Sequence, residues 1–97
     1  MHQEYIYRFS AEKSAILKAK RGIGFDDVIY GMENGCLLDT IDHTSQKYPH
    51  QKMFVVEVNG YTYVVPFVQN GEEVFLKTIY PSRNMTKRYL GEKNEKN

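Results

Sequence analysis

The chain has little of what secreted and membrane proteins need. Its 97 residues include one cysteine, Cys36, which cannot form an internal disulfide and does not indicate a disulfide-stabilised secreted scaffold. No apolar run approaches the roughly 20 residues that span a bilayer. Residues 1–5 are polar and carry no apolar signal-peptide core. We therefore expect a cytoplasmic protein.

The chain is also too short for a large enzyme fold. A domain typically takes about 100–200 residues, so there is room for one core, which excludes Rossmann dehydrogenases, TIM barrels and kinases. A hydrophobic fraction of 41% and a charged fraction of 26% are typical of a soluble globular protein. We expect one domain over residues 1–90 and a disordered polar tail over residues 91–97.

The net charge of +1 hides an uneven distribution. Residues 1–21 carry five basic and two acidic side chains, residues 22–80 carry three basic and eight acidic, and residues 81–97 carry five basic and two acidic. If the fold brings the two ends together, they form one basic face that attracts phosphates. Otherwise they are two solvated helices with no shared face, which composition alone favours.

A strand and a helical hairpin are predicted in the first third of the chain. Residues 4–9 alternate loosely and are rich in aromatic side chains, as in a strand. Ser10 is a favourable N-cap for a helix over residues 11–20, which has few apolar side chains and should pack shallowly. Gly22 ends that helix.

The second helix is predicted from Gly24 to Gly35, with two carboxylates in its first turn, where the helix dipole favours them. Its apolar side chains follow a helical period and form one core stripe: Phe25, Val28, Ile29 and Met32.

Three strands joined by two Asn-Gly turns are predicted next, over residues 52–58, 61–69 and 72–80. Asn-Gly between apolar strands indicates a type I′ hairpin, so the strands form an antiparallel meander. A short strand over residues 37–41 before the meander is optional. A basic helix over residues 83–90 follows it, capped by Ser82.

Two-residue loops at both turns set the expected register, which places Val58 opposite Tyr61 and Val65 opposite Leu76. One sheet face then carries the core: Phe54, Val56, Val58, Tyr61, Tyr63, Val65, Phe67, Val74 and Leu76. The other face is apolar with a few polar groups: Met53, Val55, Glu57, Thr62, Val64, Phe75, Lys77 and Ile79. Pro66 cannot donate a ladder bond in the middle strand, so a bulge or incomplete pairing is expected there.

The expected fold class is therefore α+β, with two N-terminal helices packed on an antiparallel meander and a short basic C-terminal helix. Two stretches add a resemblance: Ser10–Val28, with its Lys-Arg-Gly-Ile corner followed by Gly-Phe-Asp-Asp, and Ile79–Tyr89, with its Ile-Tyr-Pro-Ser-Arg-Asn-Met-Thr turn. With the meander between them, they resemble the RelE/ParE superfamily of bacterial toxins, and within it the BrnT family. Arg21 stands where that family usually has histidine, and Asn84 replaces the second arginine of an Arg-Arg pair.

The resemblance implies the toxin of a type II toxin–antitoxin system. Such a protein is a metal-independent endoribonuclease that arrests growth by cutting RNA, free or on the ribosome, and is neutralised by a cognate antitoxin. The alternative is a non-enzymatic inhibitor of ParE type that binds a protein target such as DNA gyrase. We expect no cofactor and no metal.

Cleavage by the 2′-hydroxyl needs a base, a fixed cation for the charge on phosphorus and an acid for the leaving oxygen. Arg83, at a strand-to-helix junction, is the candidate phosphate clamp, or an ordinary surface arginine. Lys77 and Glu57, near each other in the expected register, are either cation and base or a cross-strand ion pair. Tyr80 can donate a proton or stack a base.

The remaining candidates bind rather than react. Lys20 and Arg21 either hold the RNA backbone or complement the dipole of their helix. Lys87 and Arg88 extend the basic C-terminal helix. His43 and His50 are loop histidines or alternative proton carriers, and with Cys36 they do not make the four closely spaced ligands of a zinc site.

Overall fold

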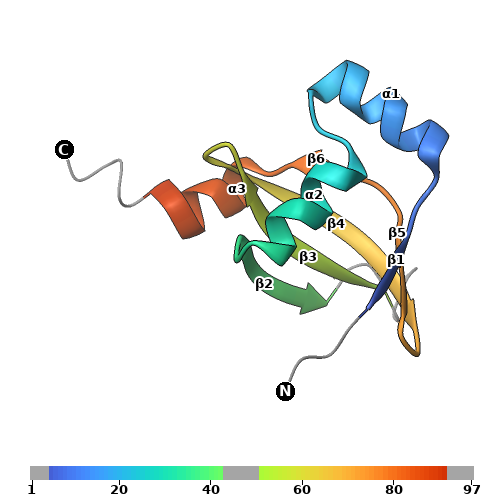
Figure 1. Cartoon of the computed structure of the whole chain (residues 1–97). Coiled ribbons are helices and arrows are strands. Elements are labelled where there is room, and N and C mark those ends of the chain that lie inside the picture. Colours follow the sequence, from blue (N-terminus) through green and yellow to red (C-terminus); the bar gives the residue numbers. More distant parts are fainter. Residues whose placement is uncertain (1–4, 43–50, 92–97) are drawn as a thin grey trace.

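A mixed β-sheet organises the fold (Figure 1). The computed structural model describes residues 5–42 and 51–91. The strands run in the order β1-β5-β4-β3-β2, β6 also pairs with β4, and β1 lies parallel to β5. The strands are β1 Ile6–Arg8, β2 Leu37–Asp42, β3 Lys52–Val58, β4 Tyr61–Asn70, β5 Glu73–Leu76 and β6 Tyr80–Pro81. The helices are α1 Ala11–Arg21, α2 Phe25–Glu33, α3 Arg83–Thr86 and the π-helix η1 Lys87–Gly91.

The α+β class is confirmed, and the optional strand is present as β2. The elements follow the predicted order except that the third meander strand is divided into β5 and β6 and the C-terminal helix into α3 and η1. The sheet face that packs against α2 is called the front face. Its side chains and those of the helical hairpin form one buried cluster: Leu17, Ile23, Phe25, Val28, Phe54, Val56, Val65, Phe67, Val74, Leu76 and Ile79. The opposite, back face carries Met53, Val55, Thr62 and Val64, which are also buried.

The two N-terminal helices are joined by a tight polar corner. Ser10 caps α1 as predicted, and Ser14 and Leu17 are the buried residues of that helix. Ser14 Oγ accepts a hydrogen bond of 2.9 Å from the amide of Phe25, which ties α1 to the start of α2. A Cβ on Gly24 would lie 2.8 Å from that oxygen, so glycine is required for this close approach.

The first hairpin of the meander has the predicted register, with Val58 opposite Tyr61. Asn59 and Gly60 both have positive φ, as a type I′ turn requires.

The second hairpin differs from the prediction by two residues, because its loop is Gly71-Glu72 rather than Asn70-Gly71. Phe67, not Val65, lies opposite Leu76. Gly71 has a φ of 65° and Asn70 has no positive φ, so glycine occupies the first loop position, as in a type II′ turn. A shift of two keeps the sheet faces, and Val74 and Leu76 therefore remain in the core.

The third predicted strand is broken beside Pro66. Proline lacks an amide proton, and although its carbonyl accepts from the amide of Lys77 at 2.8 Å, β5 ends at Leu76. Pairing resumes with Tyr80 opposite Val64. The prediction of incomplete pairing at Pro66 is thus confirmed.

The break inserts one residue into the β5–β6 side relative to β4. Leu76 pairs with Phe67 and Tyr80 with Val64, so four steps on one side match three on the other. One extra residue exchanges the faces that follow it. Ile79, predicted on the back face, lies instead in the core with 0% exposure, and Tyr80 turns to the back face.

The C-terminal helix crosses the back face. The carbonyl of Thr62, in β4, accepts from the amide of Ser82, and the amide of Thr62 donates to Thr86 Oγ1 at 2.9 Å. Three residues later, the hydroxyl of Tyr89 reaches Asp39 on β2. Since β3 separates β4 from β2 and α2 occupies the front face, the segment from Ser82 to Tyr89 passes over the back face.

Among residues 5–42 and 51–91, no helix has the length and apolar character needed to cross a bilayer. Gly91, predicted to begin the tail, belongs to η1, and the rest of that tail lies outside the described residues.

The buried position of Ile79 predicts a large loss of stability when its side chain is shortened. Ile79→Ala should lower the free energy of unfolding by about 2–5 kcal/mol, because it leaves a cavity in the core. Ile16→Ala, at a residue that is 48% exposed, is the matched control and should change it by less than about 0.5 kcal/mol. Urea unfolding measures both; equal effects would contradict the inward position of Ile79.

Candidate functional site

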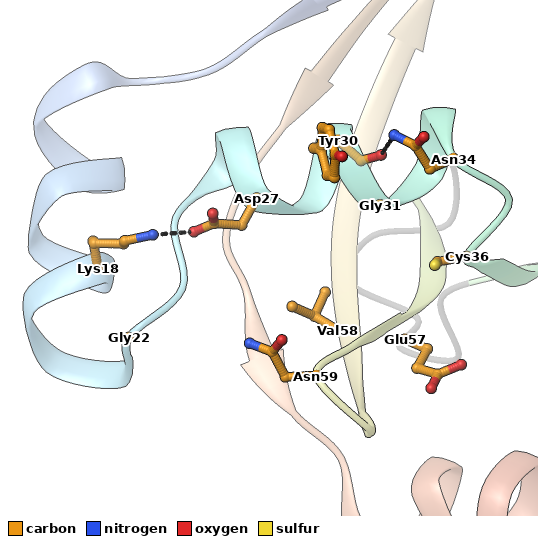
Figure 2. A pocket seen from close by; sticks show the side chains of 10 residues that line it. All are labelled: Lys18, Gly22, Asp27, Tyr30, Gly31, Asn34, Cys36, Glu57, Val58 and Asn59. Carbon is orange, nitrogen blue, oxygen red and sulfur yellow. Dashed lines mark hydrogen bonds and ion pairs between the residues drawn. The ribbon is translucent and has the colours of Figure 1, made fainter.

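A pocket of about 300 Å³ lies between the hairpin of α1 and α2 and the turn from β3 to β4 (Figure 2). Its lining residues are Lys18, Gly22, Asp27, Tyr30, Gly31, Asn34, Cys36, Glu57, Val58 and Asn59.

Three polar side chains of this pocket, those of Lys18, Asp27 and Asn34, form hydrogen bonds within the protein. Lys18 Nζ lies 2.7 Å from Asp27 Oδ2, and the amide of Gly24 donates to the same carboxylate oxygen at 2.8 Å. Burial raises the pKa of Asp27, but these two hydrogen bonds outweigh it and hold the pKa below its ordinary value. The side-chain amide of Asn34 donates to the carbonyl of Tyr30 at 2.7 Å. These contacts account for the fold of the hairpin.

Of the predicted catalytic residues, Glu57 alone borders this pocket. Its side chain points away from α2 in Figure 2, as expected for a residue that alternates with Val56 and Val58 of the front face. The pocket is therefore separate from the predicted site.

The other three predicted catalytic residues lie along one side of β4, the side on which β5 and β6 pair. The amide of Lys77 bonds to the carbonyl of Pro66, and Tyr80 lies opposite Val64. Arg83 follows Ser82, whose amide bonds to the carbonyl of Thr62, and is the first residue of α3. Lys77, Tyr80 and Arg83 are all exposed.

Each of these side chains has a distinct environment. The Lys77 ammonium lies 5.0 Å from the centre of the Phe75 ring. The Tyr80 hydroxyl donates to Met53 Sδ at 3.6 Å. Among the described residues, the ion pairs are Arg8–Glu73 and Lys18–Asp27, so neither Lys77 nor Arg83 has an acidic partner there.

Lys77 and Glu57 share the back face but are farther apart than expected. The two-residue shift of the second hairpin places Lys77 beside Pro66, while Glu57 lies opposite Thr62 on the other side of β4. Four residues along and two strands across correspond to roughly 16 Å between their backbones. The expected proximity of the two residues is therefore wrong, and they form no cross-strand pair.

The two basic ends of the chain do not share a face. Lys20 and Arg21 end α1, which lies with α2 on the front side, whereas Lys87 and Arg88 lie in η1 beyond α3 (Figure 1). The alternative of two separate basic helices, favoured by composition, is the one found. Only Lys87 and Arg88 of these four adjoin the side of the sheet that carries Tyr80.

A carboxylate that the sequence did not single out fastens the C-terminal helix. The Tyr89 hydroxyl donates to Asp39 Oδ2 at 2.6 Å, and the amide of Thr40 donates to Oδ1 at 2.8 Å. The bond from Tyr89 lowers the pKa of Asp39 the most, with smaller contributions from Thr40 and the charge of Arg88. The partners are 50 residues apart, and no local sequence pattern indicates such a contact.

No cluster of three or more histidine, cysteine, aspartate or glutamate side chains suited to a metal ion occurs within residues 5–42 and 51–91. His43 and His50, the alternative proton carriers, lie outside the described residues.

The Asp39–Tyr89 bond predicts a pH-dependent contribution to stability. Because the native pKa of Asp39 lies below its ordinary value of about 3.9, the bond stabilises the fold above that value and its contribution is lost as pH falls through the native pKa. Tyr89→Phe should therefore lower the free energy of unfolding at neutral pH and have little effect in strong acid. Unfolding curves across this range measure the difference.

Tyr30→Phe is the control, since it removes a tyrosine hydroxyl from a side chain that is 70% exposed on α2. A Tyr89→Phe effect of constant size at every pH would contradict the assigned hydrogen bond.

Comparison with protein-family models, with curated proteins and with solved structures finds no match to this chain.

Proposed function

We propose that this chain is the toxin of a toxin–antitoxin pair and acts as a metal-independent endoribonuclease of RelE/ParE type. The observation that carries the proposal is that Tyr80 and Arg83 lie close together in the chain, one before and one after Ser82. Both side chains are exposed, both border β4, and Arg83 has no acidic partner among the described residues.

The chemistry assigns a role to each group, and Tyr80 either protonates the leaving 5′-oxygen or stacks a base. Arg83 donates its planar fork of N–H groups to the scissile phosphate and stabilises the charge that builds on phosphorus. Glu57 is the candidate base for the 2′-hydroxyl. It lies opposite Thr62, whose carbonyl accepts from the amide of Ser82, the residue between β6 and Arg83. Two strand spacings, about 10 Å, separate the backbones of Glu57 and Ser82.

The surrounding charge favours a polyanion on this side of the molecule. Lys77 lies on the same side of β4 as Arg83, and Lys87 and Arg88 follow it in η1. Lys20 and Arg21 are not part of this surface. A cognate antitoxin would neutralise the toxin by covering the same cations.

The second candidate is a non-enzymatic inhibitor that binds a protein target. It is favoured by the exposed apolar side chains Ile6 and Val68, which lie on the back face beside Phe75. Exposed apolar groups on one face suit a protein partner. The two candidates differ in whether growth arrest is accompanied by RNA cleavage.

The test compares Arg83→Ala with Arg21→Ala during inducible expression in a bacterium, with growth and RNA integrity followed together. Wild type and Arg21→Ala should arrest growth and cut RNA. Arg83→Ala should cut RNA about 10²- to 10³-fold more slowly, because one fixed donor to the transition state is lost.

Circular dichroism of both purified variants controls for folding. RNA cleavage unchanged in a folded Arg83→Ala variant would contradict the role of Arg83. Growth arrest with intact RNA in the wild type would favour the protein-target candidate, and no arrest would overturn both.

A further inference from the structure

Aromatic and basic side chains alternate along one side of β4, on the back face of the sheet. Phe75 lies opposite Val68, the amide of Lys77 bonds to Pro66, Tyr80 lies opposite Val64, and Arg83 follows the residue bonded to Thr62. The positions of Phe75, Lys77 and Tyr80 are thus two residues apart along β4, and Ser82, the residue before Arg83, bonds two residues farther on. The four side chains Phe75, Lys77, Tyr80 and Arg83 are called the aromatic–cation row.

The rings of this row are unusually open for aromatic side chains. Phe75 is 45% exposed and Tyr80 is 38% exposed, whereas the front-face rings of Phe54 and Phe67 are buried and stacked on each other. The bond from the Tyr80 hydroxyl to Met53 Sδ holds one edge of that ring against the sheet. Two partly exposed rings on a sheet suit the stacking of planar groups.

The cations of the row are available to a ligand. Lys77 lies over the Phe75 ring, a weak contact that it can exchange for a phosphate. Glu73, the acidic residue of β5, is paired with Arg8 at 3.4 Å. A ligand that supplies planar groups and negative charges in alternation satisfies every member of the row, whereas an apolar protein surface would leave both cations unpaired.

The spacing favours an extended single strand. Two residues of a β-strand span about 6.7 Å. Stacked nucleotides in a duplex advance about 3.4 Å along each strand, so a nucleic acid that follows the row must have its bases unstacked. Phe75 and Tyr80 are two such steps apart, which corresponds to three nucleotides.

We propose that the aromatic–cation row binds single-stranded RNA, with the outer bases of a trinucleotide stacked on Phe75 and Tyr80. Lys77 contacts a phosphate between these bases, and Arg83 contacts the phosphate beyond Tyr80. The inference rests on the proposed function for the choice of RNA and for the reaction at Arg83. It adds Phe75 as a binding residue and excludes duplex RNA as the preferred ligand.

The experiment measures binding without cleavage. The probe is a fluorescent 2′-O-methyl hexanucleotide, which has no free 2′-hydroxyl to attack the phosphate, and its anisotropy is followed as protein is added. Phe75→Ala should weaken binding roughly 5- to 150-fold, the usual range for loss of one stacking partner. Phe75→Trp should restore it. Tyr30→Ala, which removes an exposed ring from α2 on the front side, is the control and should bind as the wild type does.

Salt dependence and strandedness give two further readouts. Lys77→Met should reduce the slope of log affinity against log salt by about 0.7, the loss of one phosphate contact on a single strand. A self-complementary duplex of the same chemistry should bind more weakly than the single strand.

Three results would each contradict the proposal that the aromatic–cation row binds single-stranded RNA. They are equal binding by the wild type and a folded Phe75→Ala variant, equal binding of single strand and duplex, and no binding by the wild type. Binding that follows these expectations in a protein that cuts no RNA would support the row and contradict the proposed ribonuclease.

Discussion

The missing amide proton of Pro66 is the constraint on which the outer surface depends. Without it, β5 cannot continue its ladder on β4, and the chain inserts one residue before β6 begins. That residue reverses the alternation of faces, so Ile79 enters the core and Tyr80 turns outward. Had the strand continued unbroken, Tyr80 would lie in the core and Ile79 on the back face. The break therefore determines that the ring of Tyr80 lies on the back face.

The two faces of the sheet differ in how they are covered. The front face carries most of the apolar burial, and the helical hairpin closes over it with α1 only lightly attached. The back face is crossed by α3 and η1, in which no residue is buried, and is held by polar contacts such as the bond between Tyr89 and Asp39. This face combines exposed rings with the cations Lys77 and Arg83, which have no acidic partner among residues 5–42 and 51–91, a composition that serves binding better than stability.

Local patterns predict much of this fold, and their failures have identifiable causes. The caps at Ser10 and Ser82 and the turn at Asn59-Gly60 follow from short-range chemistry and are confirmed. The prediction for the second turn is wrong because an Asn-Gly sequence does not determine which two residues form the loop. Gly71 takes the first loop position instead of the second. The predicted proximity of Lys77 and Glu57 is wrong for the same reason, because it depended on that loop. The Asp39–Tyr89 bond and the outward turn of Tyr80 depend on contacts distant in sequence or on the size of a bulge, which no local pattern specifies.

Photo-crosslinking tests most directly whether RNA binds to the back face beside the break at Pro66, where Phe75 and Tyr80 lie. A single-stranded oligonucleotide with 4-thiouridine at alternate positions is irradiated with the wild-type protein, and the modified peptides are identified by mass spectrometry. The account predicts crosslinks at Phe75 and Tyr80 that an excess of unlabelled single strand suppresses. Crosslinks confined to α1 or α2, with neither ring of the back face modified, would contradict it.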